Sequence, residues 1–187
     1  GLSLSKEGIS LIQGAHQVAQ KLTNNIFPLK SAAGLSVEKL KMTAKGPQHD
    51  RTWMLVHAAE KNAGKFITQR DRGSEKLALV QPSIHNNGEI SFSVVGGDKA
   101  LHLDADLFFE HEGNVEIWGD SCPAIDGGDQ AAEWFSNYLD IPCRLVKMPD
   151  DYKRPVDAQF SQSADQVSLA DGFPLLITNM ASLKSLQ

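Results

Sequence analysis

The sequence predicts a mainly β protein with an α+β C-terminal part, and two observations support this prediction. Short apolar segments separated by Gly, Asn and Pro turn signals recur up to residue 113, which is typical of an antiparallel barrel or sandwich. Beyond that point a helical pattern alternates with strand-like segments. We therefore expect an antiparallel β-barrel domain over 21–113, the incomplete start of an α+β domain over 114–187, and an unassigned extension over 1–20.

The first elements differ in the strength of their patterns. A short helix is expected over 15–22, and the segment 21–29 reaches Pro28, which suits an edge strand. The segment 35–44 alternates only loosely and is expected to be a strand. The strongest strand is 51–56, RTWMLV, which is apolar on both faces and is therefore expected at the centre of a sheet or in a closed barrel.

Hairpins are expected after this strand. The turn signal Asn62-Ala63-Gly64 predicts a return through 65–69. Further strands are expected over 77–82, 89–95 and 100–103, with Asn- and Gly-rich turns between them. The segment 89–95, EISFSVV, alternates most cleanly, which indicates one buried and one exposed face.

The C-terminal part is expected to contain one clear helix after a strand at 115–118. One buried face at helical spacing is formed by Ala131, Trp134, Phe135, Tyr138 and Leu139. Asp126-Gly-Gly-Asp129 supplies candidate N-caps, and Pro142 ends the helix. A strand over 144–148 and a polar, irregular loop over 149–166 follow.

The last residues are expected to form a strand over 173–178 and a helix that Asn179 caps. A helix with so few residues before residue 187 would need something to pack on. We therefore expect the chain to be a fragment, cut inside its second domain.

Composition excludes several function classes. The net charge of −5 disfavours nucleic-acid binding through a basic surface, and we expect neither a membrane-spanning segment nor a signal peptide within these residues. Two cysteines make no disulfide framework, so reduced thiols and a cytoplasmic location are expected. Cys143 is expected to be buried, and Cys122, beside Pro123 in a loop, to be the more exposed thiol.

The segment 26–56 carries the best candidate for a binding site. It joins two strand-like pieces, one ending in Lys30-Ser31 and the other opening with Asp50-Arg51. An amine, a hydroxyl and a guanidinium brought together would form a receptor for an anion such as phosphate. The alternative is that both cations lie at strand ends in solvent and make ordinary surface ion pairs.

Other motifs that carry chemistry are missing. The six histidines show no metal-ligand spacing, and each is expected to be a surface or core residue. No nucleophile elbow, P-loop or dinucleotide fingerprint occurs. The turn Gly96-Gly97-Asp98 is a hairpin signal, since no helix follows it to offer its N-terminus to a phosphate.

Several segments in order resemble a MOSC-domain protein preceded by its N-terminal β-barrel domain. They are FPLKSAAGLSVEKL, HDRTWMLV, GKFITQRDR, VEIWGD, AAEWFSNYL and VSLADGFPLLITNMASLKSL. The resemblance covers 23–187 and is greatest to bacterial MOSC reductases that carry a C-terminal ferredoxin and to the mitochondrial amidoxime-reducing component. Together the segments are specific, whereas each alone would be a weak signal.

The resemblance implies that the intact protein binds the molybdenum cofactor, molybdopterin, and it implies a set of cofactor-binding residues. They are Lys30, Ser31, Arg51, Thr178, Asn179 and Ser182. Lys30 and Ser31 match the pair that contacts the anionic end of the cofactor, and Arg51 matches the arginine of an Asp-Arg motif. Ala32-Ala33 depart from the family pattern, which often has a further basic or polar residue there.

The resemblance further implies reduction of N-hydroxylated bases or amidoximes, with a 2Fe-2S ferredoxin outside this chain as electron donor. The metal-ligating cysteine of the family matches neither Cys122 nor Cys143, so the 187-residue fragment is expected to be inactive by itself. Two alternatives remain open. One is the sulfur-carrier domain of a molybdenum cofactor sulfurase, whose family is also associated with pyridoxal phosphate, and the other is a binding module without chemistry.

Overall fold

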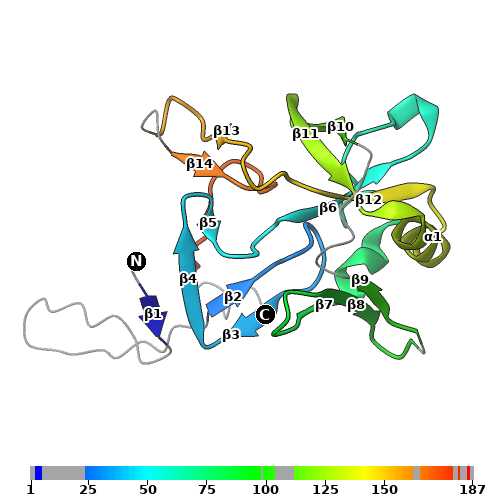
Figure 1. Ribbon diagram of the computed structural model, residues 1–187, viewed down its shortest axis with the longest axis horizontal. Helices are drawn as coiled ribbons and strands as arrows, with labels where there is room; N and C mark the ends of the chain where they lie inside the picture. The colour runs from blue at the N-terminus through cyan, green and yellow to red at the C-terminus, as the bar shows by residue number, and fades with distance from the viewer. Residues whose placement is uncertain are drawn as a thin grey trace, which may run out of the picture.

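The computed structural model describes residues 3–5, 24–97, 99–103, 112–161, 165–178, 181 and 185 (Figure 1). They form a mostly β fold with antiparallel sheets and one α-helix, α1 (Gly128–Leu139), which confirms the predicted class. The helix expected over 15–22 and the cap expected at Asn179 lie outside the described residues.

The N-terminal strands form two small sheets. β1 (Ser3–Ser5) pairs antiparallel with β4 (Lys39–Thr43), which also pairs with β5 (Gly46–Pro47). β2 (Asn24–Ile26) pairs antiparallel with β3 (Leu35–Val37). β1 therefore places part of the expected extension in a sheet with β4.

The central sheet has the order β10 (Glu112–Ile117), β11 (Asp120–Asp126), β12 (Cys143–Lys147) and β6 (Trp53–His57), and all its pairs are antiparallel. Because β6 pairs with β12 along its whole length, this sheet joins residues from both sides of the expected boundary after residue 113.

β6 begins at Trp53, two residues later than predicted, because Arg51 lies in a turn with a φ of 47°. Its burial on both faces is confirmed, since Trp53 and Met54 belong to different core clusters. The predicted hairpin return is also confirmed: Ile67 donates its backbone N–H to the Leu55 carbonyl at 2.8 Å, and Val56 and Phe66 form an antiparallel bridge.

A further sheet packs beneath α1 in the view of Figure 1. It consists of β7 (Val80–Ile84), β8 (Ile90–Val94) and β9 (Leu101–Leu103), paired antiparallel in that order. β7 begins later than predicted because the apolar residues before it form a 3₁₀ turn, η2 (Glu75–Leu79). A shorter 3₁₀ turn, η1 (Glu60–Asn62), lies in the expected hairpin turn.

α1 buries the face that its sequence predicts. Ala131, Phe135 and Leu139 are the buried residues of the helix. The Phe135 ring meets the Phe92 ring of β8 edge-on, with centroids 5.4 Å apart. Asp126 accepts a hydrogen bond from the backbone N–H of Gly128 at 2.7 Å. The helix therefore packs its apolar stripe against both β12 of the central sheet and the sheet of β7, β8 and β9, and its buried residues belong to the larger core cluster.

The prediction that Cys122 is an exposed loop thiol was wrong. Cys122 lies in β11 and is 1% exposed, next to the buried Ala124. The inward positions of this strand carry small side chains, so the sequence lacks the strong apolar alternation that marks a strand. Both cysteines are free and buried, as expected for reduced thiols.

The described residues of the predicted loop, 149–161 and 165–166, are irregular as expected, apart from a short pair of strands, β13 (Arg154–Pro155) and β14 (Gln166–Val167). The strand predicted over 173–178 is wrong, because no residue there has strand structure and Ile177 is 89% exposed. Pro174 lacks a backbone N–H to donate, which disfavours pairing in a sheet. Within the described ranges, no helix has both the length and the apolar character that a bilayer crossing requires.

Candidate anion-binding site

Lys30 is held beside the start of β6. Its backbone N–H donates to the Trp53 carbonyl at 2.8 Å, and the preceding Leu29 forms a parallel bridge with Trp53. Its side chain is 6% exposed. The alternative of a solvated cation at a strand end is therefore wrong for Lys30. Ser31 follows in the same turn with a φ of 67°, a conformation uncommon for a residue with a side chain.

Arg51 lies two residues before β6, in the turn that leads into this strand. Its backbone N–H donates to the Phe27 carbonyl at 2.7 Å, and its own carbonyl accepts from the Leu169 N–H at 3.0 Å. Its Nη2 contacts the Asp50 carboxylate at 3.0 Å and the Pro174 carbonyl at 3.5 Å. Among the described residues, nothing accepts from its buried Nε–H. A buried donor of this kind normally has a partner.

Asp171 is the carboxylate that meets Lys30. The two side chains form an ion pair between Lys30 Nζ and Asp171 Oδ1. The same oxygen accepts a hydrogen bond from Trp118 Nε1 at 3.0 Å. Phe66 closes the other side, with Lys30 Nζ 5.1 Å from its ring centroid. Asp171 is thus fixed by two donors, Lys30 and Trp118, that are far apart in the sequence.

Arg154 is a buried residue of this region that, like Asp171 and Trp118, no sequence pattern singled out. It is 3% exposed. Its Nη1 donates to the carbonyls of Ser168 and Ala170, at 3.1 and 2.6 Å, and its Nη2 to Asp120 Oδ2 at 2.9 Å and to the Asp171 carbonyl at 3.3 Å. Its Nε also lacks an acceptor within the described part of the chain. Backbone carbonyls leave no spacing pattern in the sequence, so no signal pointed to this arginine.

Lys30, Arg51 and Arg154 lie close enough together for the two arginine charges to act on Lys30. Burial lowers the pKa of Lys30, the hydrogen bond and charge of Asp171 oppose this, and the charges of Arg51 and Arg154 lower it further. Burial raises the pKa of Asp171, but the hydrogen bonds from Lys30 and Trp118 outweigh it and hold the pKa below its usual value. Burial likewise raises the pKa of Asp50.

The predicted site residues divide into two groups. Lys30 and Arg51 are brought close enough to influence each other's charge, and Ser31 lies beside Lys30. Thr178 is exposed, and Asn179 and Ser182 lie outside the described residues.

This cluster has the chemistry of an oxyanion receptor. It combines the buried amine of Lys30 with the guanidinium groups of Arg51 and Arg154, whose buried Nε–H groups have no acceptor among the described residues. Phosphate oxygens are the acceptors that such donors bind most strongly. The described ranges contain no group of three His, Cys, Asp or Glu side chains arranged to hold a metal ion. The residues present therefore fit the phosphate of a cofactor such as molybdopterin.

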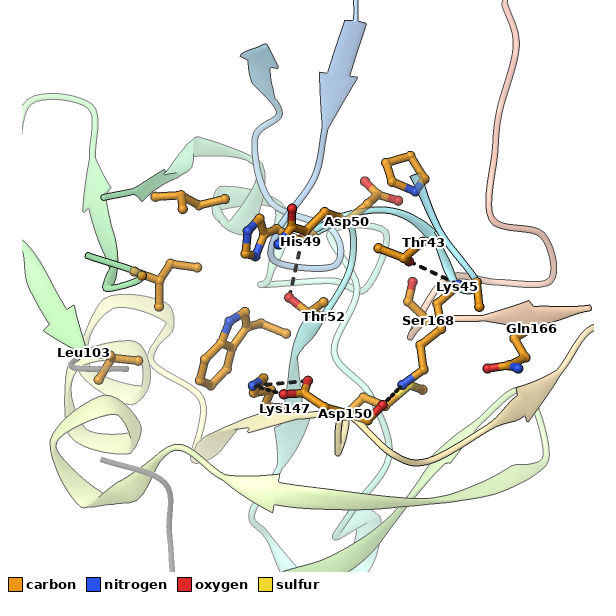
Figure 2. Close-up of a pocket in the computed structure, with 18 residues that line it drawn as sticks. Thr43, Lys45, His49, Asp50, Thr52, Leu103, Lys147, Asp150, Gln166 and Ser168 are labelled. Atoms are coloured by element: carbon orange, nitrogen blue, oxygen red, sulfur yellow. Dashed lines mark hydrogen bonds and ion pairs between the residues drawn. The ribbon is translucent and has the colours of Figure 1, made fainter. Parts of the chain in front are cut away.

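Two cavities border the region. One of about 580 Å³ is lined by Trp118, Tyr152, Arg154 and Asp171, and it adjoins the anion site. The other, of about 620 Å³, contains neither Lys30 nor Arg51. Figure 2 shows its polar side, where Lys147 meets Asp150 and Thr52 donates to the His49 carbonyl.

Comparison with known proteins gives the chain its family. A family model, the MOSC N-terminal beta barrel domain, matches residues 20–142. A molybdenum cofactor sulfurase from Drosophila willistoni is 30% identical over 98% of this chain and 23% of its own length. Mitochondrial amidoxime reducing component 2 is 29% identical in both Bos taurus and Homo sapiens, over 86% of this chain and 48% of theirs.

A solved structure from Bordetella bronchiseptica aligns with 53% of this chain and 72% of its own, at 20% identity and a TM-score of 0.42. The chain spans about half the length of the amidoxime reducing components and about a fifth of the sulfurases that it matches. The family model covers most of the chain, including Lys30, Ser31 and Arg51. The chain belongs to the family of proteins that carry the MOSC N-terminal beta barrel domain.

Proposed function

We propose that this chain is part of a molybdenum-cofactor-dependent oxidoreductase that reduces N-hydroxylated bases or amidoximes. The observation that carries the proposal is the meeting of Lys30 and Arg51, from opposite ends of the segment 26–56, in a buried cluster. The similarity to amidoxime reducing components supports the substrate class, and the similarity to cofactor sulfurases supports the cofactor.

In this proposal the residues of the chain bind and orient the cofactor. Lys30 Nζ and the Arg51 guanidinium neutralise the phosphate, and the Arg51 Nε–H gains an acceptor, which none of the described residues provides. Ser31 offers a hydroxyl beside Lys30. Thr178, Asn179 and Ser182 are proposed as further contacts. When bound, the cofactor supplies redox chemistry that amino-acid side chains cannot provide.

The chemical step needs groups beyond those just described. A soft metal centre is held by a thiolate, and burial raises the pKa of both Cys122 and Cys143, which disfavours their thiolate forms. We therefore propose that the 187 residues bind the cofactor without turning over substrate. Electrons would come from a 2Fe-2S ferredoxin, and the protein would act in the cytoplasm.

Sulfur transfer is the second candidate, because molybdenum cofactor sulfurases are among the relatives at 30% identity. Both functions use the same cofactor, so the phosphate site serves either. The full-length parent protein decides between them: reduction of an amidoxime with a ferredoxin donor supports the reductase, and transfer of sulfur to the cofactor supports the sulfurase. A binding module without chemistry would do neither.

Cofactor retention tests the proposal on this chain. The purified protein is mixed with free molybdenum cofactor and passed through gel filtration, and the pterin in the protein peak is measured by its fluorescence after oxidation. We expect wild type and Arg72→Ala, which removes an exposed arginine outside the cluster, to retain pterin equally. Arg51→Ala should lose most of it. If Arg51→Ala retained as much pterin as wild type, Arg51 would not bind the cofactor, and the alternative of a binding module without chemistry would be favoured.

A further inference from the structure

Asp171 introduces a negative charge into a site built for an anion. Its two contacts, with Lys30 Nζ and Trp118 Nε1, both fall on Oδ1. Among the described residues, no hydrogen bond or ion pair reaches Oδ2, and the side chain is 62% exposed. One carboxylate oxygen is thus fixed beside the ammonium group, while the other remains able to accept a hydrogen bond.

Each of the three cations of the site is paired with one carboxylate. Asp171 pairs with Lys30, Asp50 with Arg51, and Asp120 with Arg154. A ligand oxygen that reaches Lys30 must therefore approach the Asp171 carboxylate as well. The Asp171 carboxylate repels a fully ionised oxyanion. An oxyanion that keeps an acidic proton can instead donate a hydrogen bond from its O–H group to Asp171 Oδ2.

We propose that Asp171 makes the anion site selective for oxyanions that carry a proton, such as the monoanion of a phosphate monoester, and against sulfate esters and sulfate. The inference rests on the proposed function, because it assumes that an anion binds at Lys30 and Arg51. Selectivity of this kind comes from a repulsive group placed against the wrong ligand as much as from the attraction for the right one.

The Asp171 side chain is ionised over the range in which the probes are compared, from about pH 5 to about pH 8. The groups that face it are the Lys30 ammonium, the Trp118 indole N–H and the Arg70 guanidinium, while Arg154 binds its backbone carbonyl. All of them favour the carboxylate form, and the pKa of Asp171 lies below its usual value. Asp171 is therefore an acceptor, and the proton of the hydrogen bond has to come from the ligand.

Methyl phosphate and methyl sulfate form a matched pair of probes. At about pH 5, below the second pKa of about 6 that phosphate monoesters have, both are monoanions of the same shape, and only methyl phosphate carries a proton. Titration calorimetry on the whole chain should give methyl phosphate an affinity at least tenfold higher, which is the contribution expected of one hydrogen bond to a charged group.

The variant Asp171→Asn should reduce this ratio to less than about threefold, chiefly because methyl sulfate no longer meets a carboxylate. Asp157→Asn is the control, since Asp157 lines the adjoining cavity and should leave the ratio unchanged. Trp118→Phe keeps the carboxylate and its Lys30 pair, and it should retain the selectivity. If Asp171→Asn fails to fold, the change in the wild-type affinity for methyl phosphate between about pH 5 and about pH 8 provides the test.

Raising the pH provides a second test, because the affinity for methyl phosphate should change differently in wild type and in Asp171→Asn. From about pH 5 to about pH 8 methyl phosphate becomes a dianion, so its affinity should fall in wild type and hold or rise in Asp171→Asn. Methyl sulfate keeps its charge and reports any titration of the protein itself. Equal affinities for the two probes in wild type would overturn the inference and leave the anion site standing. Failure of wild type and Asp171→Asn to bind either probe would overturn the anion site itself.

Discussion

Leu169 donates its backbone N–H to the carbonyl of Arg51 at 3.0 Å, and this bond joins the two halves of the anion site. Two residues further on, Asp171 meets Lys30. The turn that carries Asp171 is thus hydrogen-bonded to Arg51 through Leu169 and ion-paired with Lys30 through Asp171. Arg154 also donates hydrogen bonds to two carbonyls of this turn, those of Ser168 and Ala170. Residues that are distant in the sequence are positioned as one unit by this short segment.

Gly46 and Pro174 form a close contact that should be sensitive to a single methyl group. A Cβ on Gly46 would lie 2.7 Å from Pro174 Cβ, and the glycine has a φ of 104°. Gly73 has a similar φ of 94° with nothing within 4 Å, so Gly73→Ala carries only the backbone cost. We expect Gly46→Ala to lower the free energy of unfolding by a further ~1–3 kcal/mol relative to Gly73→Ala, the cost typical of overpacking.

Urea denaturation measures this difference. Because Arg51 Nη2 contacts the Pro174 carbonyl, Gly46→Ala should also weaken anion binding, whereas Gly73→Ala should not. Equal destabilisation by the two alanines would show that Pro174 does not pack on Gly46.

Lys30 should give the protein a rising stability in alkaline solution. Burial puts its folded pKa below the unfolded value, which is about 10.4. Between these two pKa values the unfolded state binds more protons, so the free energy of unfolding increases with pH in this window. In Lys30→Met this contribution is absent, and the rise should be smaller than in wild type.

The measurement is urea denaturation at several pH values from neutral to about pH 10, just below the unfolded lysine pKa. Lys39→Met, which removes an exposed lysine of β4, should keep the wild-type pH dependence. If Lys30→Met and Lys39→Met gave the same curve, Lys30 would not be a buried cation in solution.

Cys122 should behave as an inert thiol. It is 1% exposed, and burial raises its pKa, whereas reactive cysteines are accessible and have lowered pKa values. In native protein we expect Ellman's reagent to label neither Cys122 nor Cys143 at an appreciable rate. Ser121→Cys places a thiol at the exposed neighbouring position of β11 and should react rapidly. Rapid labelling of the wild-type protein would contradict the placement of Cys122 in a buried strand.

Local patterns were sufficient for much of the fold. The apolar stripe through Phe135 predicted α1, and the turn residues Asn62-Ala63-Gly64 predicted the hairpin that returns to Leu55, because both signals arise between neighbours in the sequence. β11 was missed because its buried positions carry Cys122 and Ala124, which are too small to produce a clear apolar alternation.

The site could be predicted only in part. Lys30 and Arg51 were identified by chemical type and position, but their burial depends on pairing with Trp53 and Leu169, which no local pattern specifies. No sequence pattern marked Asp171 as a site residue, since its contacts with Lys30 and Trp118 are long-range.

The most direct test of the anion site is an NMR titration of the arginine Nε–H groups. The Arg51 Nε–H is buried and has no acceptor among the described residues, and its resonance can be assigned by its loss in Arg51→Lys. Addition of methyl phosphate should shift this resonance in a saturable way, with the dissociation constant that calorimetry gives, because the phosphate supplies the missing acceptor. The exposed Arg72 should not respond. Saturable binding of methyl phosphate without a shift at Arg51 would contradict the account.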